Sequence, residues 1–75
     1  MIYTCTDGFG KKIDIELARV VSIDEVSTDY TFFAFKARYQ EGTKAIEVGA
    51  FKNRNDAQRE RDALDKAKAD EVNSI

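Results

Sequence analysis

Residues 6–12 (TDGFGKK) combine two glycines with two lysines, residue types that could hold a phosphate group. A phosphate-binding P-loop needs the spacing GxxxxGK[ST] between a strand and a helix, because backbone N–H groups and the helix N-terminus then point at the phosphate. Here the spacing differs, and the alternation of Ile13 and Ile15 with acidic residues predicts that a strand follows. We therefore interpret this segment as a hairpin turn.

A second candidate is FFAFKARY, residues 32–39, which shares its central residues with the RNA-recognition phrase [KR]-G-[FY]-[GA]-[FY]-V-x-[FY]. The flanking positions do not match, and no helix is predicted between the first two strands, as that RNA-binding fold requires. We therefore interpret one set of alternating residues as a core face, comprising Phe33, Phe35, Ala37 and Tyr39.

The other face of the same segment carries aromatic and cationic side chains, which are enriched at binding hot spots. The sequence therefore predicts a partner-binding patch of six residues, namely Tyr30, Phe32, Lys36, Arg38, Glu47 and Phe51. Two alternatives stay open at this point. Either the N-terminal strands cover this face and bury Ile2, Tyr3, Val20 and Val21 against it, or the sheet stays open and the patch is accessible.

Residues that commonly carry catalysis are scarce in this chain. It contains no His and one Cys, so an imidazole base, a Cys-based zinc site and an intramolecular disulfide are excluded. The 14 carboxylates include pairs such as Asp24–Glu25 and Asp14–Glu16, but they alternate with apolar residues as solvent-facing positions do. Cys5 lies in a predicted strand and is interpreted as a small apolar residue. We expect no enzyme, no cofactor and no metal site.

The 75 residues have a net charge of −2 and suffice for one small domain, which we place at residues 1–70, with 71–75 as a frayed tail. The charge is evenly spread, which weakens the case for a nucleic-acid partner. A single Cys, no signal-peptide pattern and no long apolar run lead us to expect a cytoplasmic protein without membrane contact.

The elements that would position these residues follow from hydrophobic periodicity. Strands are predicted at residues 2–6 and 13–17, then at 20–26 after a bend near Ala18. A hairpin over residues 30–51, turning at Glu41 and Gly42, would place Lys36 opposite Glu47, Phe33 opposite Ala50 and Phe32 opposite Phe51.

Asn53, with Asp56 three residues later, predicts the start of a helix over about residues 54–69. Its apolar face comprises Ala57, Leu64 and Ala67. The predicted fold class is α+β, an antiparallel meander of four to five strands with one C-terminal helix packed on one face.

The pattern IELARVVSI, YTFFAFKARY and AIEVGAFKNRNDAQRERDAL resembles a group of short, uncharacterised bacterial and phage proteins. In those proteins a β-meander ends in a hairpin with Gly at its tip, and a short phrase opens a charged C-terminal helix. The positions that carry the resemblance are Gly42, Phe51, Asn53, Ala57 and Leu64. The resemblance implies the fold and supplies no functional residues.

The functional hypothesis from the sequence is a small, non-catalytic protein-binding regulator or inhibitor of the phage or mobile-element type, of which anti-CRISPR proteins are one example. One alternative is a nucleic-acid-binding domain that uses Tyr30, Phe32, Lys36 and Arg38. Another is a structural homo-oligomer, joined as a homodimer across a two-fold axis.

Overall fold

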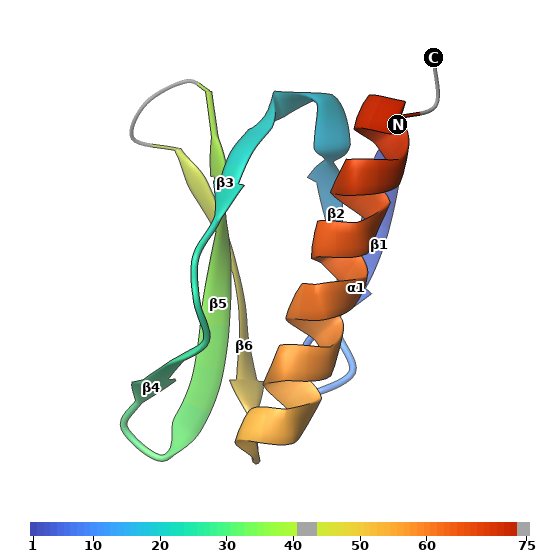
Figure 1. The fold of residues 1–75 in the computed structure, drawn as a ribbon. Coiled ribbons are helices and arrows are strands. Elements are labelled where there is room, and N and C mark those ends of the chain that lie inside the picture. The colour runs from blue at the N-terminus through green and yellow to red at the C-terminus, as the bar shows by residue number, and fades with distance from the viewer. Residues whose placement is uncertain (41–43, 74–75) are drawn as a thin grey trace.

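The computed structural model describes residues 1–40 and 44–73 and has an α+β fold, as predicted (Figure 1). Its antiparallel strands form two sheets that share one C-terminal helix. The elements in chain order are β1 (Ile2–Thr6), β2 (Lys12–Glu16), the short 3-10 helix η1 (Leu17–Arg19), β3 (Val20–Ile23), β4 (Ser27–Asp29), β5 (Phe32–Tyr39), β6 (Ala45–Phe51) and α1 (Arg54–Asn73).

β1 and β2 form a hairpin whose turn is organised by Asp7. Its carboxylate accepts hydrogen bonds from the backbone N–H groups of Phe9 and Lys11, both at 2.9 Å. Gly10 has a φ of +86°, which favours glycine over residues with a Cβ. Since a strand follows this turn, the interpretation of TDGFGKK as a hairpin turn is confirmed.

The second sheet is centred on β5. β3 and β4 pair with successive parts of β5, and β6 pairs with the same stretch along the opposite edge. The predicted register is confirmed along the middle of the hairpin, where Lys36 lies opposite Glu47 and Phe35 lies opposite Val48. The predicted turn at Glu41 and Gly42 lies outside the described residues.

The predicted register is wrong at the far end of β6. Phe51 lies opposite Phe33, because β6 contains one extra residue at a bulge where Ala50 adopts a φ of +63°. The bulge turns Phe51 to the core face, where it is 6% exposed and its ring stacks on Phe35 at a centroid distance of 6.3 Å. Phe51 therefore does not face Phe32 and does not belong to the exposed patch.

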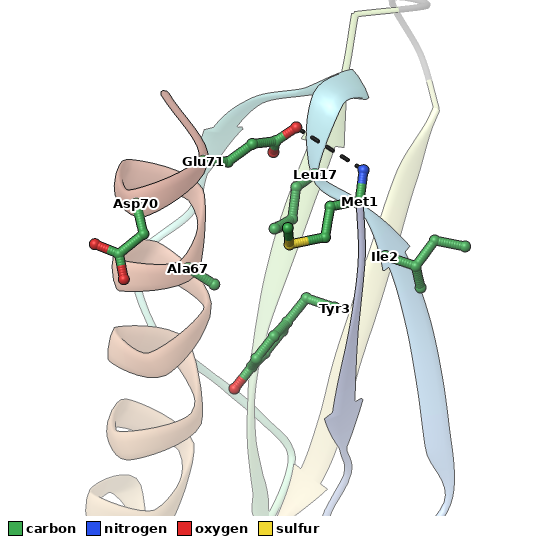
Figure 2. A pocket seen from close by; sticks show the side chains of 7 residues that line it. All are labelled: Met1, Ile2, Tyr3, Leu17, Ala67, Asp70 and Glu71. Atoms are coloured by element: carbon green, nitrogen blue, oxygen red, sulfur yellow. Dashed lines mark ion pairs between the residues drawn. The ribbon is translucent and has the colours of Figure 1, made fainter. Parts of the chain in front are cut away.

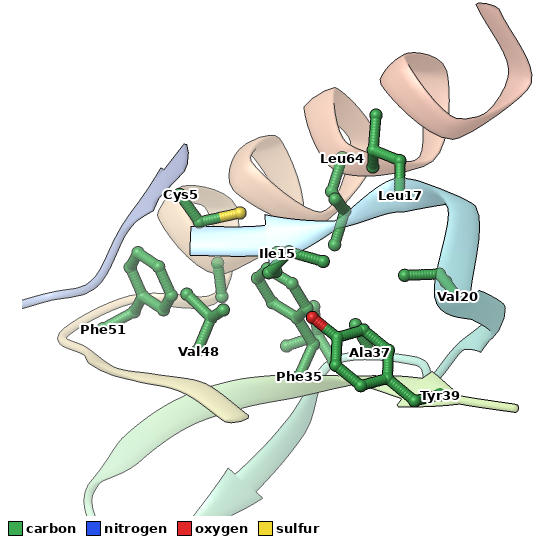
Figure 3. Close-up of a cluster of buried hydrophobic side chains, with 12 residues drawn as sticks. Cys5, Ile15, Leu17, Val20, Phe35, Ala37, Tyr39, Val48, Phe51 and Leu64 are labelled. Atoms are coloured by element: carbon green, nitrogen blue, oxygen red, sulfur yellow. The ribbon is translucent and has the colours of Figure 1, made fainter. Parts of the chain in front are cut away.

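The core lies between the second sheet and a layer formed by the β1–β2 hairpin and α1 (Figure 3). Side chains from both layers meet there: Cys5, Ile15 and Leu17 from the hairpin side, Phe35, Ala37, Tyr39, Val48 and Phe51 from the sheet, and Ala57 and Leu64 from the helix. The N-terminal strands thus cover the same sheet face as the helix. The opposite face stays open. Of the two alternatives in the sequence analysis, the open sheet is therefore the one observed.

The start of α1 is held by the predicted cap. The side-chain oxygen of Asn53 accepts a hydrogen bond from the backbone N–H of Asp56 at 2.9 Å, and its amide donates to the Asp56 carboxylate at 3.0 Å. This reciprocal arrangement satisfies a backbone donor that the first turn leaves without a helical partner. The helix continues beyond the predicted end near Ala69 and reaches Asn73.

A stripe of basic side chains on α1 fixes the segments that connect the strands. Arg54, Arg61 and Lys68 are spaced seven residues apart and therefore share one side of the helix. Lys68 donates to the carbonyl of Leu17 at 2.7 Å, Arg61 to those of Asp24 at 2.9 Å and Ile23 at 3.2 Å, and Arg54 to that of Val26 at 3.4 Å. Charged donors thus satisfy backbone carbonyls where regular strand pairing is interrupted or absent.

Candidate functional site

The first candidate site is the sheet face that the helix and the N-terminal hairpin leave open. Phe32, Lys36 and Arg38 alternate along β5 with the core residues and therefore point to this face. Glu47 of β6 lies directly opposite Lys36, and both side chains are exposed. The structure therefore brings four of the six predicted patch residues onto one open face.

An unpredicted residue, Phe9, joins this face from the turn between β1 and β2. Its ring packs edge-on against Phe32, with ring centroids 5.9 Å apart and an interplanar angle of 66°. Phe9 is nevertheless 74% exposed. The sequence does contain a signal that could have identified Phe9. A phenylalanine between two glycines in a polar turn is exposed unless the turn docks on another part of the chain.

The turn that carries Phe9 is held against β6 by a close backbone approach. The N–H of Gly8 donates to the carbonyl of Gly49 at 2.8 Å. A Cβ added at Gly8 would lie 1.8 Å from the backbone oxygen of Ala50, so only glycine fits at this position. The Gly8 contact therefore helps to place Phe9 beside Phe32.

Tyr30 lies in the two-residue turn between β4 and β5, immediately before the strand that begins at Phe32. Its side chain is 94% exposed, and its φ of +56° is uncommon for a tyrosine. The turns that carry Phe9 and Tyr30 lie toward the same end of the molecule (Figure 1). The open face therefore has its aromatic residues at one end and its charged residues further along β5.

Arg38 is engaged in an ion pair that the sequence analysis did not predict. Its guanidinium meets the Asp24 carboxylate at 2.9 Å from Nε and 2.8 Å from Nη2. The hydrogen bond from Arg38 lowers the pKa of Asp24, and the hydrogen bond to Asp24 raises the pKa of Arg38. This pairing offsets the charge that Arg38 could otherwise present to a phosphate.

The basic residues of α1 give little further support to a nucleic-acid interface. Arg54 and Arg61 donate to backbone carbonyls, and the Arg54 guanidinium also lies over the ring of Phe33 at 5.1 Å. Arg59 is exposed and lies 3.9 Å from Asp56. Two of the three helix arginines are therefore committed to holding the fold together.

A second candidate site is a cavity of about 270 Å³ between β1 and the C-terminal part of α1 (Figure 2). Its lining residues are Met1, Ile2, Tyr3, Leu17, Ala67, Asp70 and Glu71. The Met1 ammonium lies 2.9 Å from Glu16 and 3.9 Å from Glu71. The hydrogen bond with Glu16 raises the pKa of this ammonium and lowers that of the carboxyl. The sequence analysis did not predict this cavity.

Cys5 lies in the core rather than at either candidate site. Burial raises the pKa of its thiol to about 12, and the nearby Glu60 carboxylate contributes a smaller part of this increase. The thiol is therefore protonated at neutral pH, which fits a small apolar packing role. Across residues 1–40 and 44–73, no group of three or more acidic or cysteine side chains is arranged to hold a metal ion.

The helix of the described chain is not apolar enough to cross a membrane. Comparison with family models, curated proteins and solved structures found no match to this chain.

Proposed function

We propose that this protein is a non-catalytic binding module that recognises another protein through its open sheet face. The observation that carries the proposal is the Phe9–Phe32 pair, in which an edge-on aromatic contact leaves Phe9 74% exposed. Large exposed aromatic side chains are typical anchors of protein–protein interfaces, where they gain most from removal from water.

The surroundings of this pair support the same proposal. The Lys36–Glu47 and Arg38–Asp24 pairs lie further along the same face and carry charges of both signs. Apolar anchor residues next to polar residues of both charges are typical of a protein-binding surface. A single-stranded nucleic acid would instead favour an excess of cations beside the aromatic rings.

In its narrower form, the proposal is that binding inhibits or regulates a larger molecular machine, as phage-encoded and anti-CRISPR inhibitors do. The support for this form is the small size of the domain and the pattern resemblance described above. A protein that acts only by occupying a surface needs no catalytic residues of its own.

A capture experiment tests the proposed surface. We expect affinity purification from host cells to recover a partner with the wild-type protein and to lose it with the Phe9→Ser/Phe32→Ser variant. Ile2→Ser is the matched control, because Ile2 is 59% exposed and lies on β1, in the other sheet. Binding should then be reproduced with the two purified proteins.

Thermal unfolding must accompany the capture, since Phe32 is partly buried. If a folded Phe9→Ser/Phe32→Ser variant still bound the partner identified by capture, the proposed surface would be wrong. Light scattering distinguishes the homodimer alternative, because a dimer doubles the measured mass. Steep loss of binding with added salt would favour a nucleic-acid partner.

A further inference from the structure

We propose that the free edge of β6 binds an extended segment of another protein by strand addition, with a cationic side chain of that segment opposite Glu47. This inference rests on the proposed function, because it names how the partner is held beside the open face. β6 forms one edge of the second sheet, since it pairs with β5 and with no other strand of the described chain (Figure 1).

The hydrogen bonds of the β5–β6 hairpin define which backbone groups face this edge. The N–H of Tyr39 donates to the carbonyl of Lys44 at 3.0 Å, so these two residues form a hydrogen-bonded pair. Because such pairs alternate with non-bonded pairs in an antiparallel ladder, Ile46 also points its backbone groups toward β5. The N–H and C=O groups of Ala45 and Glu47 therefore point outward.

Other strands of the molecule have backbone groups that are satisfied by side chains of α1. On the opposite side of the second sheet, where β3 ends, Arg61 donates to the carbonyls of Ile23 and Asp24. On β1, the N–H of Thr6 donates to the carboxylate of Glu60 at 3.2 Å. The helix thus occupies backbone groups of β1 and of the β3 side of the sheet.

The edge of β6 has no such contact over most of its length. Among the residues that the structure describes, no hydrogen bond reaches the outward backbone groups of Ala45 or Glu47. The turn at Gly8 meets this edge only at Gly49, whose carbonyl accepts from the Gly8 N–H at 2.8 Å. Unpaired groups in a row form a template for another strand. Residues 44–48 therefore offer room for one short strand.

The charge of Glu47 favours one kind of strand. Its side chain is exposed in the middle of the free edge and forms no ion pair among the described residues. A charge at a sheet edge disfavours indiscriminate pairing, whereas a cation directly opposite stabilises it. Full pairing of residues 44–48 with the same segment of a second copy would instead place the two Glu47 carboxylates diagonally on one face. A strand of a different protein that carries Lys or Arg is the better fit.

The added strand would continue the open face. Its cation would lie in the same row as Glu47 and Lys36, and the side chains on either side of that cation would point to the other face, beside the partly buried Ile46. The Gly8 turn, which carries Phe9, ends the free edge. The added strand and Phe9 would therefore border one continuous surface.

Titration with the synthetic peptide acetyl-IKVTE-amide, followed by amide chemical shifts in NMR, tests this proposal. The peptide is designed to pair antiparallel with β6, with its Lys opposite Glu47 and its Thr opposite Ala45. We expect saturable shifts centred on residues 45–47, with a Kd of about 1 mM or weaker. N-methylation of the peptide Lys should abolish binding, because that N–H would face β6. N-methylation of the peptide Val is the matched control, since that N–H would face away and binding should persist.

Variants of the protein then locate the edge. Glu47→Pro should abolish peptide binding and stay folded, because proline removes an N–H that points outward from an edge strand. Ile46→Pro should instead unfold the protein, since it removes a hydrogen bond to β5. Glu47→Gln should weaken peptide binding by about two- to fivefold, which measures the contribution of the charge. Circular dichroism checks the fold of each variant.

No saturable shifts, shifts centred away from β6, or equal binding of the two N-methylated peptides would overturn the proposal. A wild-type dimer that Glu47→Pro converts to a monomer would overturn it too, because a second copy would then occupy the edge. The peptide is designed to end before the Gly8 turn and not to reach Phe9, so its failure would leave the open-face surface to the capture experiment. A captured partner that Phe9→Ser/Phe32→Ser loses and Glu47→Pro keeps would overturn strand addition alone.

Discussion

Two pairs of phenylalanines lie on opposite faces of β5 and differ in how far they are buried. Phe35 and Phe51 stack in the core at a centroid distance of 6.3 Å, and Phe35 is 1% exposed. Phe9 and Phe32 meet at 5.9 Å on the open face, where Phe9 is largely exposed. The distances are similar, but only the first pair is covered by the helix and the hairpin.

The contact between two rings therefore does not by itself reveal how much the pair contributes to folding. Burying a phenylalanine side chain contributes about 1.5–3 kcal/mol relative to leaving it exposed. The core pair supplies that free energy to folding. For the open pair, much of it is still available and would be gained when a partner covers Phe9.

The largest expected effect is that of Phe35→Ala, which removes a fully buried ring. It should lower the free energy of unfolding by about 3–5 kcal/mol, enough to unfold much of so small a domain. Phe32→Ala should cost less, because its ring is only partly buried. Urea denaturation followed by circular dichroism compares the two. A larger loss for Phe32→Ala would mean that the roles of the two faces are reversed.

The next effect concerns the turn that carries Phe9 to the open face. Gly8→Ala should destabilise the protein by about 1–3 kcal/mol, since the added Cβ collides with backbone at Ala50 and the turn must move. Nuclear Overhauser contacts between the Phe9 and Phe32 rings should weaken at the same time.

Gly10→Ala is the matched control for this turn. A Cβ at Gly10 meets no atom within 4 Å, so the cost should be the backbone strain of a positive φ alone, about 1 kcal/mol. If both variants kept the ring contact and lost equal stability, the close approach at Gly8 would not be what positions Phe9.

A pH experiment tests whether Cys5 is buried in the core. The pKa of its thiol is about 12 in the folded protein, above the ordinary value of 9.0, so the unfolded chain loses this proton first. This thiol therefore does not change the stability well below pH 9, and it should lower the stability as pH rises from 9 to 12, by about 1.4 kcal/mol per pH unit at most. Cys5→Ala should lack this component in paired denaturation curves. Identical pH dependence of the two proteins would show that Cys5 is not buried as described.

The smallest effect is expected on the rim of the open face, at the Asp24–Arg38 pair. Asp24→Asn and Arg38→Gln should each change stability only slightly, because exposed ion pairs contribute little. A double-mutant cycle should detect a coupling that weakens in high salt. Since the pKa of Asp24 is lowered from 3.8, this coupling should be present at neutral pH and disappear as pH falls below that value. A coupling unchanged by salt or acid would indicate a buried pair instead.

Local patterns allowed much of the fold to be predicted from the sequence. Alternation of apolar and polar residues located β1 and the register between Lys36 and Glu47, and Asn53 with Asp56 marked the start of α1. These features depend on residues close in sequence, or on a hairpin in which a shift of the register by one residue would bury charged side chains.

The candidate sites depend on contacts that such patterns do not encode. The bulge at Ala50 has no sequence signal, because a positive φ is unexpected for alanine, and it moved Phe51 from the predicted patch to the core. Phe9 reaches Phe32 only because the hairpin docks along β6. The cavity joins residues from both ends of the chain, which periodicity cannot place relative to one another.

The basic stripe of α1 also constrains which length changes the chain can tolerate. Each residue advances a helix by about 100°, so inserting one residue between Arg54 and Arg61 would rotate Arg61 and Lys68 away from the carbonyls they now bind. Leu64 would leave the core in the same step. Even seven added residues, which nearly restore the rotation, would move Arg61 and Lys68 about 10 Å along the helix axis. Polar contacts and the hydrophobic core therefore fix the length of this part of the helix together.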